Sequence, residues 1–240
     1  MARCSAPTAG MYIDVIIPAL DEASSVGGVV RGLLRLPVRH VLVVDNASQD
    51  GTARAAEQAG ALVISEPRRG YGSACLAGMR ALPPDTDLVV FLDADGSDDP
   101  AYLASLVEPI TEGRADLVVG ARRGAIETGA LTPMQRVGNA VAARWLRARF
   151  GLQATDLGPF RAIRRSALDQ LGMCDPDYGW TVEMQIKAAR AGLRYTEVAV
   201  PYRRRVGRSK ISGTLRGTVG ASVKILRLLA RYDWMRGARS

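Results

Sequence analysis

Histidine is nearly absent from this chain of 240 residues, in which His40 is the single example. It directly precedes the apolar run at 41–44, and we expect it to stand at the entry to a strand. This scarcity excludes most histidine-based mechanisms, including Ser-His-Asp triads and histidine-rich zinc sites. The three cysteines, Cys4, Cys75 and Cys174, have neither the spacing of a metal site nor that of a disulfide framework.

Long apolar stretches are missing as well. No run approaches the roughly 20 residues that a membrane-spanning helix needs, and residues 1–10 lack the apolar core of a signal peptide. We therefore expect a cytoplasmic location. The net charge of +8 is unevenly spread, because residues 201–240 hold eleven Lys or Arg and one acid. Such a basic segment suits phosphate ligands or an anionic membrane surface.

Short apolar stretches alternate with helical patterns over the first 120 residues. We expect strands at 12–18, 40–45, 61–65, 87–92 and 115–120, and helices near 23–36, 50–60, 72–82 and 100–112. This alternation predicts an α/β fold, a mostly parallel sheet with helices on both faces. The second half predicts a helix at 133–150, a loop with 156–161, a helix around 180–191 and a strand around 194–200. Since no linker interrupts the chain, we expect a flexible tail at 1–10, one domain at 11–212 and a basic amphipathic helix at 213–240.

Two acids, Asp93 and Asp95, follow the apolar fourth strand. Residues two apart in a strand point to the same side, and paired carboxylates suit a divalent cation that holds a diphosphate. A capped turn before the next helix is the alternative interpretation. Asp21, Glu22 and Asp45 follow the first two strands, so acids from three strand ends are expected at one edge of the sheet. Such an edge can bind a base and a ribose by hydrogen bonds, and a diphosphate through a metal.

Seven ordered motifs resemble those of the family-2 glycosyltransferases, and within them the polyprenyl-phosphate sugar synthases (dolichyl-phosphate mannose or glucose synthase-like). They are Val15–Glu22, Val43–Thr52, Arg68–Ala74, Asp93–Asp95, Thr155–Arg161, Trp180–Met184 and Gly207–Lys210. The chain departs from the family pattern at three of its positions. Asp21 stands for the usual Asn, Asn46 for a second Asp, and Ser97 for a Gln that can face the metal.

The resemblance implies a GT-A fold and an inverting transfer of a hexose or N-acetylhexosamine from a nucleotide sugar to polyprenyl phosphate. A UDP-sugar is the preferred donor, with GDP-mannose as the alternative. At the nucleoside, the implied residues are Pro18, Leu20, Glu22 and Asp45. At Mg²⁺ or Mn²⁺ they are Asp93, Asp95 and the weaker ligand Ser97, with Asp98 as a substitute for it. At the leaving diphosphate they are Arg204 and Lys210. A solvated basic run is the alternative for two of the three arginines at 203–205.

The residues needed on the acceptor side depend on whether the acceptor is a phosphate or a hydroxyl. A lipid phosphate is already anionic and needs no general base, but it needs cations, for which Arg136, Arg122 and Arg123 are the candidates. A neutral hydroxyl needs a carboxylate base, either Glu183 or Asp156. These two acids have structural alternatives, which are orienting an arginine and capping a turn.

The C-terminal helix leaves two interpretations open. Its apolar and basic faces, over 214–231, fit packing on the domain or contact with a membrane interface. Within enzymes, transfer to a soluble hydroxyl or phosphorylated acceptor is the second hypothesis. A non-enzymatic basic module for membrane or nucleic acid is the third, but acids at the expected ligand edge would repel nucleic acid.

Overall fold

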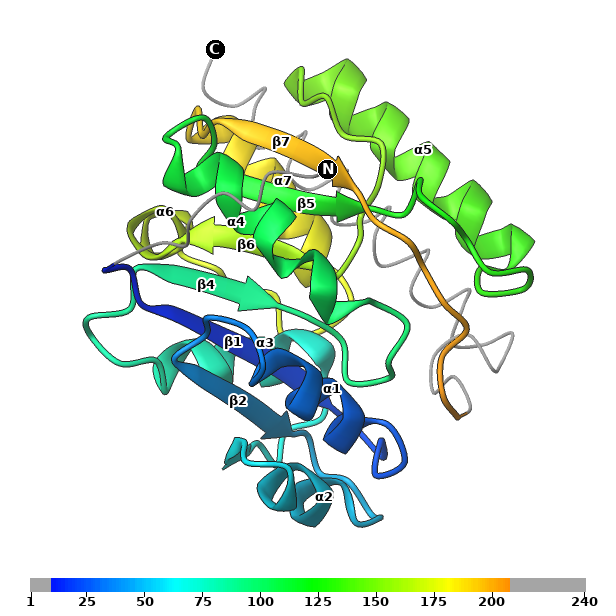
Figure 1. Ribbon diagram of the computed structural model, residues 1–240. Coiled ribbons are helices and arrows are strands. Elements are labelled where there is room, and N and C mark those ends of the chain that lie inside the picture. Colours follow the sequence, from blue (N-terminus) through cyan, green and yellow to red (C-terminus); the bar gives the residue numbers. More distant parts are fainter. Residues whose placement is uncertain (1–9, 208–240) are drawn as a thin grey trace, which may run out of the picture.

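The structure is a computed structural model that describes residues 10–207. It contains a seven-stranded sheet with the order β3-β2-β1-β4-β6-β5-β7 (Figure 1). The strands are β1 (Ile13–Ala19), β2 (His40–Asp45), β3 (Leu62–Ser65), β4 (Leu88–Phe91), β5 (Leu117–Ala121), β6 (Arg161–Arg164) and β7 (Tyr195–Ala199). The helices are α1 (Val26–Leu33), α2 (Thr52–Gln58), α3 (Tyr71–Arg80), η1 (Pro100–Tyr102), α4 (Leu103–Thr111), α5 (Pro133–Phe150), α6 (Arg165–Leu171) and α7 (Trp180–Arg190).

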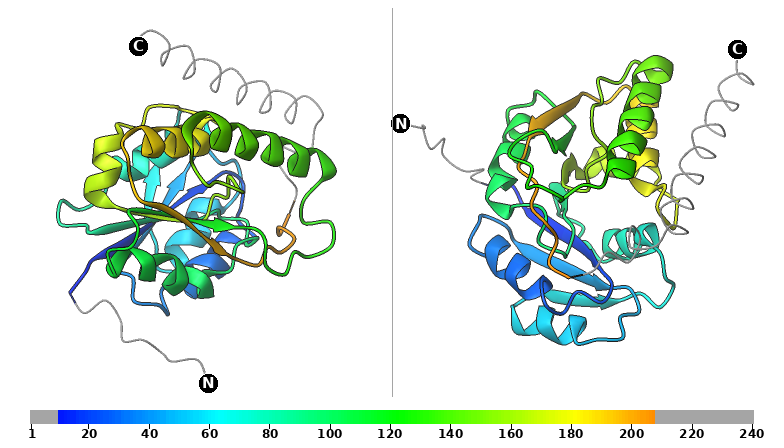
Figure 2. Two further views of the ribbon diagram at one scale, coloured as in Figure 1. Left: turned by 90° about the horizontal axis from the view of Figure 1, so that it is seen from above. Right: turned by 90° about the vertical axis from the view of Figure 1, so that its right-hand side faces the viewer.

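Alternating side chains of the central strands build two cores, one on each face of the sheet. Val15 and Ile17 of β1 pack with buried residues of α1, α2 and α4, whereas Ile16 packs with those of α3, α6 and α7. Both sets are almost fully buried because the sheet is covered on each face, as Figure 2 shows in two views. This confirms the predicted α/β fold with helices on both faces, and it explains the continuous apolar runs of β1, β2 and β4.

Strand pairing brings the predicted strand ends to one edge of the sheet. β1 runs parallel to β2 with Ala19 opposite Asp45, and parallel to β4 with Ile16 opposite Phe91. The loops after β1, β2 and β4 therefore leave the sheet on the same side. This is the edge at which ligands bind in open α/β sheets.

The prediction failed for one strand and one helix. Residues 161–164 form β6, antiparallel to both β4 and β5, and 165–171 form α6, where the sequence had suggested no regular element. β6 has only Ala162 and Ile163 between its two arginines, Arg161 and Arg164, so no apolar run marks it. The guanidinium of Arg161 is nevertheless buried, where it donates hydrogen bonds to the carbonyl oxygens of Leu157, Gly158 and Thr181.

The expected helix at 213–240, the tail at 1–9 and Lys210 lie outside the described residues. Within residues 10–207, no helix combines the length and the apolar character needed to cross a membrane.

Candidate functional site

The turns after β1 and β2 hold each other at the ligand edge. The backbone N–H of Glu22 donates to Oγ1 of Thr52 (2.7 Å), and that of Gln49 donates to Oδ1 of Asp21 (2.7 Å). Asp21 adopts a left-handed backbone with φ of 51°, and the following Glu22 is buried, with 7% of its surface exposed. Pro18 and Leu20 flank this turn and Asp45 ends the neighbouring strand, so the structure brings the four expected nucleoside residues to one edge.

Asp93 leaves β4 next to Tyr71, whose hydroxyl donates to Oδ1 of Asp93 (3.1 Å). Tyr71 opens α3 between two glycines that pack against the loop at 175–176. A Cβ atom on Gly72 would come within 2.0 Å of the carbonyl oxygen of Asp175, so only glycine permits this approach. Burial, followed by repulsion from Asp95, raises the pKa of Asp93 to about 7. The sequence had indicated this loop as a motif but not Tyr71 as a partner of the acid.

Asp95 is nearly buried, and both of its carboxylate oxygens have partners. Oδ1 accepts from the backbone N–H of Ser97 (2.9 Å) and from its hydroxyl (2.6 Å). Oδ2 accepts from the guanidinium of Arg205, which also lies 3.8 Å from Oε1 of Glu22. Ser97 is fully buried and its hydroxyl is directed to Asp95. It therefore orients this carboxylate, and its expected role as a metal ligand stays a prediction.

Asp98 is a buried carboxylate without a hydrogen-bond partner in the described part of the chain. It is 2% exposed, and neither of its oxygens has a hydrogen-bond partner among residues 10–207. Burial and the nearby Asp93 raise the pKa of Asp98 well above its ordinary value, while Arg122 opposes the rise. An unsatisfied buried acid is costly to keep, and such groups are typical of sites that await a ligand or an ion.

These acids fit a divalent cation that is held partly by its substrate. Asp93 and Asp95 offer hard oxygen ligands at a strand end, and a cationic group already contacts Asp95. No cluster of three or more His, Cys, Asp or Glu side chains in residues 10–207 could enclose a metal by itself. Mg²⁺ commonly keeps several waters and binds one or two carboxylates together with substrate phosphates. The donor set at β4 matches that pattern.

Residues 202–207, which we call the strap, cross the loop that follows β4. The N–H of Arg203 donates to the carbonyl oxygen of Ser97 (2.9 Å), and the N–H of Val206 donates to that of Asp95 (2.9 Å). The side chain of Arg203 pairs with Asp99 (2.5 Å), while Arg204 is 60% exposed and turns to Glu127 and Thr128. Arg203 and Arg204 are therefore surface groups, and Arg205 is the arginine that reaches the acids.

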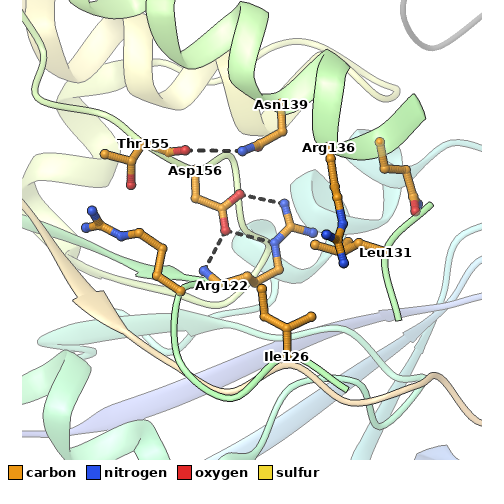
Figure 3. Close-up of a pocket in the computed structure, with 9 residues that line it drawn as sticks. Arg122, Ile126, Leu131, Arg136, Asn139, Thr155 and Asp156 are labelled. Atoms are coloured by element: carbon orange, nitrogen blue, oxygen red, sulfur yellow. Dashed lines mark hydrogen bonds and ion pairs between the residues drawn. The ribbon is translucent and has the colours of Figure 1, made fainter. Parts of the chain in front are cut away.

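A pocket of about 170 Å³ opens beside the start of α5 (Figure 3). Its lining residues are Arg122, Arg123, Ile126, Leu131, Gln135, Arg136, Asn139, Thr155 and Asp156. All three arginines expected at an acceptor phosphate thus lie in one pocket. The guanidinium of Arg122 lies 5.1 Å from the ring centre of Tyr202 in the strap, and the next strap residue, Arg203, bonds Ser97, so this pocket borders the loop after β4.

Asp156 fixes Arg122 in the wall of this pocket. The guanidinium donates from Nε (2.8 Å) and Nη2 (2.6 Å) to the two oxygens of Asp156, which also accepts from the Arg122 N–H (2.7 Å). Although burial opposes it, these bonds hold the pKa of Asp156 below its ordinary value. A carboxylate so engaged is a weak base, which favours the orienting role that the sequence left open for Asp156.

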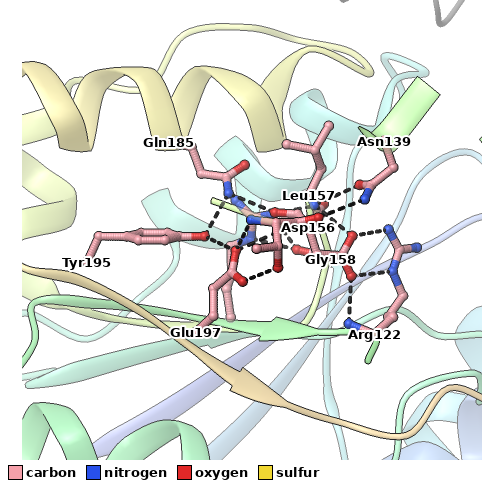
Figure 4. A network of polar contacts seen from close by, with 10 residues as sticks. Arg122, Asn139, Asp156, Leu157, Gly158, Gln185, Tyr195 and Glu197 are labelled. Carbon is pink, nitrogen blue, oxygen red and sulfur yellow. Dashed lines mark hydrogen bonds and ion pairs between the residues drawn. The ribbon is translucent and has the colours of Figure 1, made fainter. Parts of the chain in front are cut away.

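A buried polar network supports the loop that carries Asp156 (Figure 4). Oε1 of Glu197, on β7, accepts from the N–H of Thr155 (2.7 Å) and the hydroxyl of Tyr195 (2.7 Å). Its Oε2 accepts from the Thr155 hydroxyl and from Arg123 (3.1 Å). On the other side of the loop, Asn139 of α5 bonds the carbonyl oxygen of Thr155 (3.1 Å) and the N–H of Leu157 (2.9 Å). Sequence reasoning missed Glu197, because an acid in a half-buried strand carries no motif signal.

Glu183, the other expected base, does not line this pocket. Its carboxylate is 1% exposed, accepts from the N–H of Asp175 (2.8 Å) and pairs with Lys187 (2.7 Å). Although burial opposes it, hydrogen bonds from Cys174 and Lys187 lower the pKa of Glu183. Glu183 therefore holds the loop against which Gly72 packs.

Known proteins that resemble this chain in sequence and in fold are glycosyltransferases. The sequence model described as Glycosyl transferase family 2 matches residues 14–172. An uncharacterised glycosyltransferase of Mycobacterium tuberculosis is 41% identical over 92% of this chain and 100% of the relative. The undecaprenyl-phosphate mannosyltransferase of Micrococcus luteus is 35% identical over 94% of this chain and 98% of that protein. A crystal structure of glucosyl-3-phosphoglycerate synthase from M. tuberculosis, in complex with Mn²⁺, UDP-glucose and phosphoglyceric acid, matches with a TM-score of 0.77 and 26% identity, covering 94% of this chain and 80% of that chain. The predicted GT-A fold is confirmed.

Proposed function

Since the chain belongs to glycosyl transferase family 2, we propose that it transfers a hexose from a nucleotide diphosphate sugar to a polyprenyl phosphate. The observation that carries this proposal is a pocket with three arginines beside the loop of acids that follows β4. The acids suit a donor diphosphate with its cation, and the arginines suit an acceptor phosphate. The related mannosyltransferase from M. luteus is named for undecaprenyl phosphate as acceptor.

In the proposed reaction, an oxygen of the acceptor phosphate attacks the anomeric carbon of the sugar. The bond from that carbon to the diphosphate breaks, the nucleoside diphosphate leaves with the electron pair, and the configuration inverts. The attacking oxygen is already anionic, so no general base is needed. Arg122, held by Asp156, would orient the acceptor phosphate together with Arg136. A bound Mg²⁺ or Mn²⁺ on Asp93 and Asp95 would supply charge neutralisation of the leaving diphosphate.

The surface next to the pocket favours a lipid over a soluble acceptor. Ile126 and Leu131 line the pocket itself. Met134, Val137 and Val141 continue from it along one face of α5 and are 53%, 60% and 50% exposed. They provide an apolar path for a polyprenyl chain that starts at the arginines. α5 also carries four arginines and no acid, which suits an anionic membrane surface.

A soluble phosphorylated acceptor is the second candidate. The solved relative with phosphoglyceric acid in its complex acts with the same fold, and a pocket of about 170 Å³ is large enough for a small anionic group. An arginine pocket serves the phosphate of either acceptor. The two candidates differ in whether the apolar path along α5 is used.

A transfer assay separates these candidates. The full-length protein is given UDP-glucose or GDP-mannose, with Mn²⁺ or with EDTA, and either a short polyprenyl phosphate or phosphoglyceric acid. We expect a metal-dependent glycosylated lipid phosphate as the product, and a lower rate for Val137→Glu than for the control Leu62→Glu, which places the same charge on a similarly exposed apolar residue of the edge strand β3. Transfer to phosphoglyceric acid alone would replace the lipid proposal with the soluble one. Transfer that ignores EDTA would contradict the metal on Asp93 and Asp95.

A further inference from the structure

We infer that Arg205 occupies the metal-facing side of Asp95 in the ligand-free enzyme, gives way to the divalent cation, and then binds the donor diphosphate. The inference rests on the proposed function, because it concerns the same donor site. It makes Arg205 a positioning residue that couples metal binding to nucleotide binding.

The contacts of Asp95 leave one side of its carboxylate for exchange. Oδ1 is held by the N–H and hydroxyl of Ser97, which is fully buried. Oδ2 is held by Arg205, whose side chain is 32% exposed. A cation that approaches Asp95 therefore meets the guanidinium rather than the serine. The side open to exchange is therefore the one that the partly exposed Arg205 covers.

Arg205 also serves a second acid of the same edge. Its Nη2 lies 3.8 Å from Oε1 of Glu22, whose side chain is 9% exposed. One guanidinium thus lies between acids from the ends of β1 and β4, whose mutual repulsion it reduces. The guanidinium is not optimally satisfied there, because its buried Nε has no hydrogen-bond partner within residues 10–207. A group with spare donors can change partners at low cost.

The backbone of the strap keeps Arg205 at the site during such an exchange. Hydrogen bonds from Arg203 N–H to Ser97 and from Val206 N–H to Asp95 fix the chain on both sides of Arg205. The movement is therefore a rotation of the side chain. Arg203 and Arg204 cannot replace it, because their side chains pair with Asp99 and Glu127 on the surface.

The exchange predicts a coupling between metal and nucleotide. A metal ion alone must displace Arg205 from Asp95 and leave its guanidinium with Glu22, at 3.8 Å, as its remaining carboxylate. A nucleoside diphosphate removes this cost, because its phosphate oxygens accept the released guanidinium in bidentate fashion. The protein should thus bind the free ion weakly and the ion with a nucleoside diphosphate strongly, and the coupling must be reciprocal.

Mn²⁺ binding tests this without any transfer reaction. Mn²⁺ alone is titrated into the full-length protein and the unbound ion is followed by electron paramagnetic resonance, then the titration is repeated with UDP or GDP. In Arg205→Ala we expect the affinity for Mn²⁺ alone to rise about tenfold, since a competing cation is lost. The enhancement by the nucleotide should fall by about tenfold. Arg205→Lys should lie between the two, because Lys lacks the bidentate contact.

Arg203→Ala is the matched control, since it removes a neighbouring arginine that pairs on the surface. It should leave both affinities within twofold of the parent protein. If Arg205→Ala leaves the affinity for Mn²⁺ alone unchanged or lowers it, the inference is wrong while the proposed function stands. If no variant and no parent protein binds Mn²⁺, even with UDP or GDP, the metal-dependent function fails together with the inference.

Discussion

Buried carboxylates at the two ends of the same sheet differ in their hydrogen-bond partners and in the direction of their pKa shifts. Asp14, at the start of β1, is fully buried and accepts four hydrogen bonds: two from Arg39 (2.6 and 3.1 Å), one from Thr86 (2.6 Å) and one from His40 (3.0 Å). Although burial opposes it, these partners lower the pKa of Asp14. At the other end, Asp98 has no hydrogen-bond partner among the described residues, and the pKa values of Asp93 and Asp98 are raised.

This difference separates Asp14, whose partners all lie in the protein, from Asp98, which has no hydrogen-bond partner among residues 10–207. Asp95 lies at the ligand end and has protein partners, but one of them is the partly exposed Arg205. A buried carboxylate with all its partners in the protein stabilises the native state, because it is better satisfied there than in the unfolded chain. A buried carboxylate without partners destabilises the native state until a ligand or ion arrives. Substitutions at the two ends should therefore have opposite effects on stability and on activity.

The largest effect is expected for Asp95→Asn at the ligand end. Loss of one metal-facing carboxylate should lower the rate of transfer by about 10³-fold, since charge on the leaving diphosphate is then poorly neutralised. Steady-state transfer rates at saturating Mn²⁺ measure this. Asp99→Asn is the control in the same loop, because Asp99 caps η1 and asparagine caps a helix equally well. An Asp95→Asn protein within tenfold of the parent rate would break the comparison.

At the opposite end, Asp14→Asn should cost about 2 kcal/mol or more of the free energy of unfolding, since it leaves a half-buried Arg39 without its main partner. The rate of transfer per folded molecule should stay the same. Asp85→Asn is the matched control, because Asp85 pairs with the same Arg39 (2.8 Å) but is 59% exposed. Its effect should stay within about 0.5 kcal/mol. Urea unfolding measures both, and equal costs would contradict the role of burial.

Glu197 tests where the boundary between the two kinds of acid lies. It is paired like Asp14, yet it supports the loop of the arginine pocket. Glu197→Gln should lower kcat/KM for the acceptor about tenfold through KM, since Asp156 and Arg122 lose their fixed positions. The KM for the donor should not change. Glu57→Gln, on the exposed side of α2, is the control. A loss confined to stability would place Glu197 with Asp14.

The sequence predicted the donor side of the site better than the acceptor side. The strands β1, β2 and β4 are apolar runs followed directly by acids, so both their existence and the shared edge could be read from periodicity and the rules of parallel sheets. β6 could not, because its buried Arg161 is satisfied by carbonyl oxygens of a distant loop. Contacts of this kind depend on tertiary structure and leave no periodic signal.

The same reason explains the partners that were missed. Tyr71, Glu197 and Arg205 stand in segments whose local pattern gives no role to the individual side chain. The sequence placed Arg205 in a basic run, and only the path of the strap over the loop after β4 distinguishes it from Arg203 and Arg204. The roles expected for Asp93, Asp95 and Arg136 remain predictions for the experiments above.

A smaller effect is expected at Asp98. Asp98→Asn removes a buried charge without a partner and keeps the shape of the side chain, so the free energy of unfolding of the ligand-free protein should rise by about 1 kcal/mol. The rate of transfer should fall if the acid serves the ligand. Urea unfolding without metal measures the first and the transfer assay the second. A loss of stability would mean that Asp98 has a partner in the native state and belongs with Asp14.

The smallest effect is expected in the pH dependence of the unfolding free energy that Asp14 contributes. Since its pKa is lowered from the ordinary value of 3.8, Asp14 binds fewer protons in the native state than in the unfolded chain. The contribution of Asp14 to the free energy of unfolding is therefore complete above pH 3.8, its ordinary pKa, and is lost as the pH falls through its lowered native-state pKa. The difference in unfolding free energy between the parent protein and Asp14→Asn should be constant from pH 5 to 7 and should shrink below about pH 4. Urea unfolding at a series of pH values checks this. A difference that persists unchanged at pH 3 would mean that the hydrogen bonds of Asp14, rather than its charge, hold this end of the sheet.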